Sequence, residues 1–156
     1  MAKEAALHQI VAVGGSAAGL ELATTLGNTV GRQRKAAVTL IDRARGHLRK
    51  PLLHEIAAGS MDVDEHELDY LAQAHWHHLC HRYGEMIGLD RTRNEGLLAA
   101  TFDEDGRKIA PQRAVRYDTL VLAVGSVTNE FGTPGVKEHA IALETTEQAS
   151  HRIRVG

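Results

Sequence analysis

The feature that most limits what this chain can fold into is a glycine cluster between an apolar run and a helical pattern. Residues 8–13, HQIVAV, are mostly β-branched or apolar and end at Gly14, which predicts a strand buried on both faces, as in a parallel sheet. Apolar residues then recur at helical spacing from Leu20 to Val30, and residues 37–41 form a second buried run that ends at Asp42. The order strand, glycine turn, helix, strand predicts a βαβ unit.

The glycine cluster is typical of turns that bind the pyrophosphate of a dinucleotide. A helix N-terminus offers unpaired N–H donors and the positive end of the helix dipole, and side chains there obstruct the ligand. The pattern asks for glycine at the tight turn, at the pyrophosphate and where helix meets strand, and Gly14, Ser16 and Gly19 hold these positions. Ser16 departs from the pattern: its Cβ stands near the phosphate, to which its hydroxyl is able to donate. We expect Ser16 to weaken binding but not to abolish it.

An acidic residue at the end of the second strand supports the same interpretation. Asp42 lies 23 residues after Gly19, where a carboxylate accepts hydrogen bonds from a ribose. A solvated strand end and a plain packing turn are the competing explanations, and the combined context favours a cofactor site. The spacing does not distinguish FAD from NAD. Arg43 and Arg45 raise the option of the 2′-phosphate of NADP, although basic residues beside a strand end are more often solvated.

The rest of the chain completes an α/β pattern. We predict a helix over 51–60, a longer helix over 64–84, a strand over 85–90, two strands over 96–102 and 107–115 around the turn 103–106, and a strand over 117–124 before Gly125 and Ser126. The predicted fold is a three-layer, Rossmann-like FAD/NAD(P)-binding domain spanning residues 1–156. Its parallel sheet uses strands near 8–13, 37–41, 85–90 and 119–124, with helices on one face and an antiparallel meander on the other.

Composition excludes several classes of protein. Eighteen Lys and Arg against twenty Asp and Glu give a net charge of -2, so nothing indicates a nucleic-acid partner. Cys80 is the single cysteine, which excludes an internal disulfide or dithiol and favours a reducing, cytoplasmic environment. The first ten residues lack the apolar region of a secretory signal. No apolar stretch approaches the roughly 20 residues of a membrane span.

Four histidines crowd residues 75–81 of the predicted helix over 64–84. The spacing of His75 with His78, and of His77 with His81, is able to place pairs on one helix face. No second ligand cluster accompanies them, so we favour a solvated face over a metal site. We expect Trp76 to be a core or interface anchor.

Three segments carry a resemblance to a known family. They are VAVGGSAAGLELATTLG at 11–27, HLRKPLLHEIAAGS at 47–60 and YDTLVLAVGSVTNEFGTPGVKEHAIAL at 117–143. Together with the insertion and meander between them, they resemble the type II NADH dehydrogenases. These are FAD enzymes of the pyridine nucleotide-disulfide oxidoreductase superfamily that pass electrons from NADH to quinone in the respiratory chain. The second and third segments are the most specific.

The resemblance implies that the N-terminal turn takes FAD rather than NADH. It puts Gly14, Gly15, Ser16, Ala17 and Gly19 at the pyrophosphate, Asp42 on the adenosine ribose, Lys50 and Pro51 near the flavin, and Gly125 and Ser126 in a second flavin-side motif. We add Arg43, beside Asp42, to the predicted cofactor contacts. Lys50 is suited to stabilise the anionic reduced flavin. Arg49 departs from the aromatic residue common at that position in the family.

The resemblance also implies parts that this sequence does not contain. In the family an NADH unit, a quinone-contacting segment and membrane-associating helices follow, so we expect 1–156 to be a fragment of an enzyme acting in the cytoplasm or at the cytoplasmic face of the membrane. We expect the fragment not to oxidise NADH efficiently, and its uncovered apolar surface makes self-association plausible. Without cysteines near residues 43–60, electrons must leave the flavin directly. A non-catalytic nucleotide-binding module and a ferredoxin reductase-like flavoprotein remain as alternatives.

Overall fold

The computed structural model describes residues 6–48, 52–60, 67–103, 105–126, 129 and 131–140. The chain divides into two compact units. The first unit combines Met1–Gly46 with Asp69–Val124, and the second combines His47–Leu68 with Gly125–Gly156.

A four-stranded parallel sheet forms the centre of the first unit. Its strand order is β11-β1-β2-β5, with β1 at His8–Val13, β2 at Ala36–Asp42, β5 at Cys80–Tyr83 and β11 at Thr119–Leu122. Strand β1 pairs with β2 along its whole length and with β11 on its other side. Three of the four predicted parallel strands are therefore confirmed.

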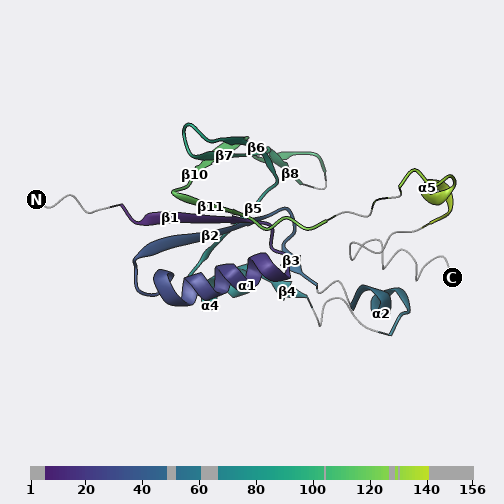
Figure 1. The fold of residues 1–156 in the computed structure, drawn as a ribbon, viewed down its shortest axis with the longest axis horizontal. Coiled ribbons are helices and arrows are strands. Elements are labelled where there is room, and N and C mark those ends of the chain that lie inside the picture. Colours follow the sequence, from purple (N-terminus) through teal and green to yellow (C-terminus); the bar gives the residue numbers. More distant parts are fainter. Residues whose placement is uncertain are drawn as a thin grey trace, which may run out of the picture. The chain divides into compact units, whose positions relative to one another are not determined.

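Two different layers cover this sheet (Figure 1). Helix α1 (Ala17–Leu26), its π-helical continuation η1 (Gly27–Gly31) and helix α4 (Tyr70–Trp76) lie on one face. A three-stranded antiparallel sheet lies on the other, with β6 (Met86–Asp90), β7 (Glu95–Leu98) and β10 (Arg113–Arg116). This arrangement confirms the predicted three-layer α/β fold.

The side chains of β1 and β2 point alternately to the two faces of the sheet, and they contribute to both hydrophobic clusters of the first unit. One cluster packs Ala12, Val38 and Leu40 against Leu20, Ala23 and Tyr70 on the helical side. The other packs Val11, Val13 and Ile41 against Leu98 and Val115 of the meander. Because successive side chains of a strand point to opposite faces, continuous apolar runs such as those predicted here serve both layers.

Smaller elements complete the described chain. The predicted turn near 103–106 connects a short hairpin of β8 (Thr101–Phe102) and β9 (Lys108–Ala110). Strands β3 (Gly46–His47) and β4 (Leu68–Asp69) form a two-stranded sheet. The second unit holds α2 (Leu53–Ala57), inside the helix predicted over 51–60, and α5 (Val136–His139). In this unit Leu48, Leu53 and Ile56 form a small buried cluster.

The structure corrects three predictions about residues 64–90. The long helix over 64–84 is wrong, because α4 ends at Trp76 and the chain then forms β5, the edge strand beside β2. The strand near 85–90 exists as β6 but pairs antiparallel with β7, not with the parallel sheet. Trp76 is 72% exposed, so it is not a core anchor. No helix in the described ranges is long and apolar enough to cross a membrane.

Candidate functional site

The glycine turn joins the end of β1 to the start of α1, and close backbone contacts explain its glycines. Gly14 has a φ of 98°, and a Cβ there would stand 2.5 Å from the carbonyl oxygen of Ala123. Its N–H donates to the Ile41 carbonyl at 2.8 Å. A Cβ on Gly19 would stand 1.9 Å from the Gly14 carbonyl oxygen. The turn and the helix therefore approach each other as closely as the dinucleotide-binding pattern requires.

The start of α1 leaves N–H groups available to an anion. The first intrahelical bond runs from the Leu20 N–H to the Ser16 carbonyl at 2.9 Å, so the N–H groups of residues 17–19 precede it. Ser16 occupies the N-cap position without a capping side-chain bond, and the first turn holds no acidic residue. Ala17 is exposed at the first helical position. A negatively charged group is stabilised at such an end.

The Ser16 hydroxyl has a partner within the protein. Its Oγ donates to the Ala123 carbonyl at 2.9 Å, which ties the turn to the residue that follows β11. A serine hydroxyl has one proton to donate. To donate to a phosphate, as the sequence suggests, it must therefore leave Ala123.

Asp42 connects the second strand to the glycine turn. One carboxylate oxygen accepts from the Gly15 N–H at 2.5 Å, and the other accepts from the Ala44 N–H at 2.6 Å. Each oxygen has more than one acceptor position, so the half-buried carboxylate keeps acceptor capacity for a ribose hydroxyl. Asp42 thus combines a structural bond with the predicted binding position.

Tyr70 is a site residue that the sequence analysis missed. Its side chain is 2% exposed, and its hydroxyl donates to the Gly15 carbonyl at 2.6 Å. Asp69 caps α4 by accepting from the N–H groups of Leu71 and Ala72, at 2.7 and 3.0 Å. An aspartate before an apolar helical pattern is an N-cap signal that could have placed the start of this helix. Nothing local in the sequence indicates that Tyr70 contacts the glycine turn.

His81, on β5, supports the Tyr70 ring. The two ring centroids are 5.1 Å apart with a tilt of 46°, and the buried His81 Nε2 has no hydrogen-bond partner within the described part of the chain. Burial lowers the pKa of His81, against the opposing effect of the Asp42 and Asp69 carboxylates. The imidazole is therefore held towards its neutral form beside the turn.

The four histidines between residues 75 and 81 do not share one helix face. His75 lies in α4, but His77 and His78 follow its end and His81 lies in the next strand. The His77 ring instead lies beside the Asn28 side chain, with its Nδ1 2.9 Å from Nδ2. Among the described residues, no group of three His, Cys, Asp or Glu side chains is placed to hold a metal ion.

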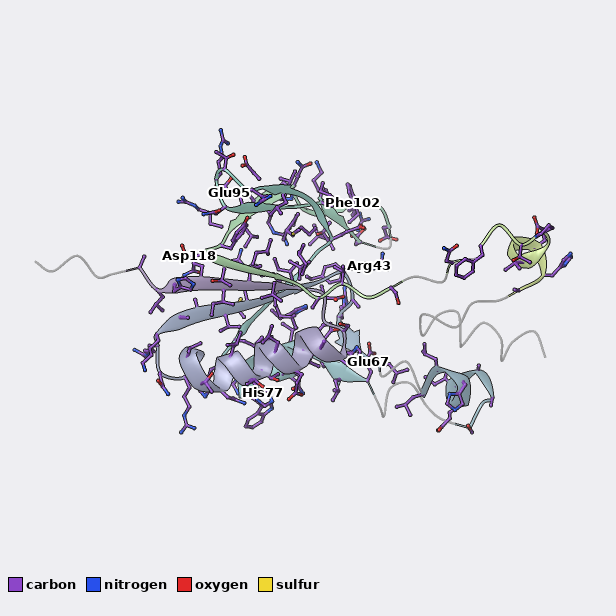
Figure 2. All side chains as sticks on the ribbon, in the orientation of Figure 1. Arg43, Glu67, His77, Glu95, Phe102 and Asp118 are labelled. Carbon is purple, nitrogen blue, oxygen red and sulfur yellow. The ribbon has the colours of Figure 1, made fainter. Side chains whose placement is uncertain are left out.

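The structure brings part of the predicted set together. Seven predicted residues lie around the carboxyl ends of β1 and β2: Gly14, Gly15, Ser16, Ala17, Gly19, Asp42 and Arg43. The exposed Arg43 side chain lies at this end of the sheet and Asp118 at the opposite end (Figure 2). Gly125 and Ser126 belong to the second unit. Lys50 and Pro51 lie outside the described residues, as does Arg49.

The chain is similar in sequence to several proteins that carry the same name. The sequence profile of the family described as "Pyridine nucleotide-disulphide oxidoreductase" matches residues 8–154. Over 143 residues the chain is 43% identical to the "Type II NADH:quinone oxidoreductase" of Haemophilus influenzae, which covers 92% of this chain and 32% of that protein. A protein of the same name from Staphylococcus aureus strain NCTC 8325 is 24% identical over 137 residues, or 87% of this chain and 31% of that protein. The chain thus spans about a third of the length of these relatives, and the resemblance found in the sequence is confirmed.

Solved structures share the fold. The sulfide:quinone oxidoreductase of Aquifex aeolicus superposes with a TM-score of 0.74 at 19% identity, over 95% of this chain and 31% of that one. NDH2 of Plasmodium falciparum, in complex with NADH, gives a TM-score of 0.72 at 21% identity, over 93% of this chain and 28% of that one. At these identities the likeness supports the architecture and not a particular reaction.

Proposed function

The chain belongs to the pyridine nucleotide-disulphide oxidoreductase family, and from this premise we propose that residues 1–156 form one FAD-binding domain of an NADH:quinone oxidoreductase. In the complete enzyme, electrons pass from NADH through FAD to a quinone at the cytoplasmic face of the membrane. The 43% identity to a protein named "Type II NADH:quinone oxidoreductase" supports the reaction. The NADH and quinone sites lie in the part of such an enzyme that this sequence does not contain.

The observation that carries the proposal is the N-terminus of α1 behind the glycine turn. Three features favour a bound pyrophosphate there: N–H groups that precede the first helical bond, a first turn without acidic residues, and glycines where a Cβ would strike backbone atoms. Asp42 stands at the end of the neighbouring strand, at the position that binds ribose in such folds. The residues present fit the pyrophosphate and adenosine ribose of FAD.

The remaining contacts follow from the family resemblance. We propose that Arg43 lies beside the adenosine end, that Lys50 and Pro51 lie near the flavin ring, and that Gly125 and Ser126 complete the flavin side. Bound FAD would supply the redox chemistry. The protein binds and orients it, and the Lys50 ammonium stabilises negative charge at the ring.

A visible absorption spectrum tests the proposal directly. The purified 156-residue protein is mixed with FAD, desalted and scanned, and we expect the flavin bands to remain with the protein. Ala17→Glu is the informative variant, because a carboxylate in the first turn is favourable to the helix itself but repels a pyrophosphate. We expect this variant to keep its thermal stability and to lose the flavin bands.

Thr25→Glu is the matched control, since it adds the same charge at an exposed position near the other end of α1. It should retain FAD as the unmodified protein does. A colourless unmodified protein, or an Ala17→Glu variant that retains flavin normally, would contradict the proposed site. The reaction itself is tested by NADH oxidation with a quinone analogue in the complete enzyme.

A further inference from the structure

Tyr70 connects the hydrophobic cluster on the helical face of the parallel sheet to the glycine turn. It begins helix α4, 55 positions after Gly15 in the sequence, and its side chain is 2% exposed. The ring packs in the same cluster as Leu20, Ala23 and Leu40. A phenol in such a core needs a hydrogen-bond partner, and its hydroxyl donates to the Gly15 carbonyl at 2.6 Å.

Gly15 is held on both sides by this arrangement. Its N–H donates to the Asp42 carboxylate at 2.5 Å, and its carbonyl accepts from Tyr70 at 2.6 Å. A Cβ at Gly15 would stand 2.2 Å from the Tyr70 hydroxyl oxygen and 2.3 Å from the ring carbon that bears it. Gly15 is not among the glycines with positive φ. A side chain at this position would therefore collide with the buried phenol, whereas the backbone conformation would allow it.

The Tyr70 hydrogen bond also fixes the direction of the next N–H group. No described peptide bond is cis, and the C=O and N–H of a trans peptide point in opposite directions. Because the Gly15 carbonyl points to the buried phenol, the N–H of Ser16 points away from it. Among the described residues the Ser16 N–H has no acceptor.

We propose that Tyr70 is a positioning residue for the dinucleotide, whose hydroxyl holds the Gly15–Ser16 peptide so that the Ser16 N–H donates to the pyrophosphate. Tyr70 itself does not touch the ligand. Its effect is preorganisation, because a peptide already held in its binding orientation loses less entropy when the ligand arrives. This inference rests on the proposed function, and it adds a residue to the same site.

Tyr70→Phe tests the inference, since it removes the hydroxyl and keeps the ring. ADP is the probe, because it carries the pyrophosphate and adenosine of FAD without the flavin. We expect the Kd for ADP to rise about five- to tenfold, as for the loss of one hydrogen bond. The chemical shift of the Ser16 amide at ADP saturation should also move less than in the unmodified protein. Tyr117→Phe is the matched control, because Tyr117 packs against the cluster on the meander face. The loss of the Tyr117 hydroxyl should leave the Kd for ADP and the Ser16 amide shift unchanged.

The outcomes separate the two proposals. An unchanged Kd in Tyr70→Phe overturns the role of Tyr70 and leaves the proposed function intact. A raised Kd with an unaltered Ser16 shift means that Tyr70 acts only on general stability, which also overturns its positioning role. An unmodified protein that binds neither FAD nor ADP overturns the proposed function. If Tyr70→Phe does not fold, the unmodified protein decides the question: a Ser16 amide that ADP does not shift contradicts the inference.

Discussion

Replacing Gly19 by alanine changes the contact between helix α1 and the glycine turn. A Cβ at this position would stand 1.9 Å from the Gly14 carbonyl oxygen and 3.0 Å from the Ala123 side chain. Real Cβ atoms essentially never approach another atom within 3.0 Å, so the helix must move from the turn by about 1 Å. The obstructing atom belongs to the backbone, and no side-chain rotation relieves the contact.

Two opposing terms set the expected size of the effect. Alanine is favoured over glycine inside a helix by about 0.5–1 kcal/mol. Overpacking a well-packed site costs about 1–3 kcal/mol, and a collision between a Cβ and a carbonyl oxygen belongs at the upper end of that range. We therefore expect Gly19→Ala to lower the free energy of unfolding by about 2 kcal/mol, or the melting temperature by about 4–8 °C in a chain of this size.

Urea unfolding followed by circular dichroism measures this change, and retained FAD absorbance measures the effect on the site. Ala18→Gly is the control, because Ala18 is exposed on the same helical turn and its replacement reports helix propensity alone. We expect that control to lose about 0.5–1 kcal/mol and to retain FAD. If Gly19→Ala is as stable as the unmodified protein, or more stable, the steric argument for glycine at this position is wrong.

Two further predictions concern the residues around the turn. Asp42→Asn leaves one acceptor oxygen for the N–H groups of Gly15 and Ala44, so we expect a loss of about 1–2 kcal/mol in urea unfolding and weaker FAD retention; unchanged stability would mean that these bonds contribute nothing. Because burial lowers the folded-state pKa of His81 from its ordinary 6.5, the unfolded chain binds more protons below that pH. The stability contribution is therefore fully present above about pH 6.5 and is lost as the pH falls towards the folded pKa. His81→Gln should flatten this dependence in thermal melts from pH 8 to 5, relative to His75→Gln at an exposed position, and equal slopes in the two variants would contradict the assignment.

The sequence predicted the parts of the fold whose local pattern matches their tertiary role. Strands β1 and β2 lie under both layers, so they are apolar throughout, and a continuous apolar run between turn signals is the strongest indication of such a strand. The glycine positions were predictable for a similar reason. The strand-to-helix turn has no room for a Cβ at Gly14 and Gly19. Only glycine fits at these two positions, so the glycines themselves mark the turn in the sequence.

Residues 67–90 could not be predicted in the same way, because their structure depends on distant partners. Strand β5, with the sequence CHRY, pairs only with β2 in the described sheet, and three of its four residues are exposed. An edge strand of this kind needs no apolar pattern, so its histidine-rich sequence resembles a solvated helix. Strand β6 is predictable as a strand, but pairing with β7 instead of the parallel sheet is decided by the meander and not by local propensity.

Ser16 departs from the glycine pattern of the dinucleotide-binding turn, but its side chain has a structural role. The pattern expects glycine here because a side chain stands near the phosphate, and the sequence alone therefore suggests a weaker site. In the structure the hydroxyl donates to the Ala123 carbonyl at 2.9 Å, the same oxygen that lies 2.5 Å from a Cβ placed on Gly14. A glycine at position 16 would lose this bond, which contributes about 1 kcal/mol, and would also loosen the unfolded chain. Serine thus ties the turn to the chain after β11 and partly offsets the steric disadvantage of its Cβ, while the backbone N–H groups stay available to the ligand.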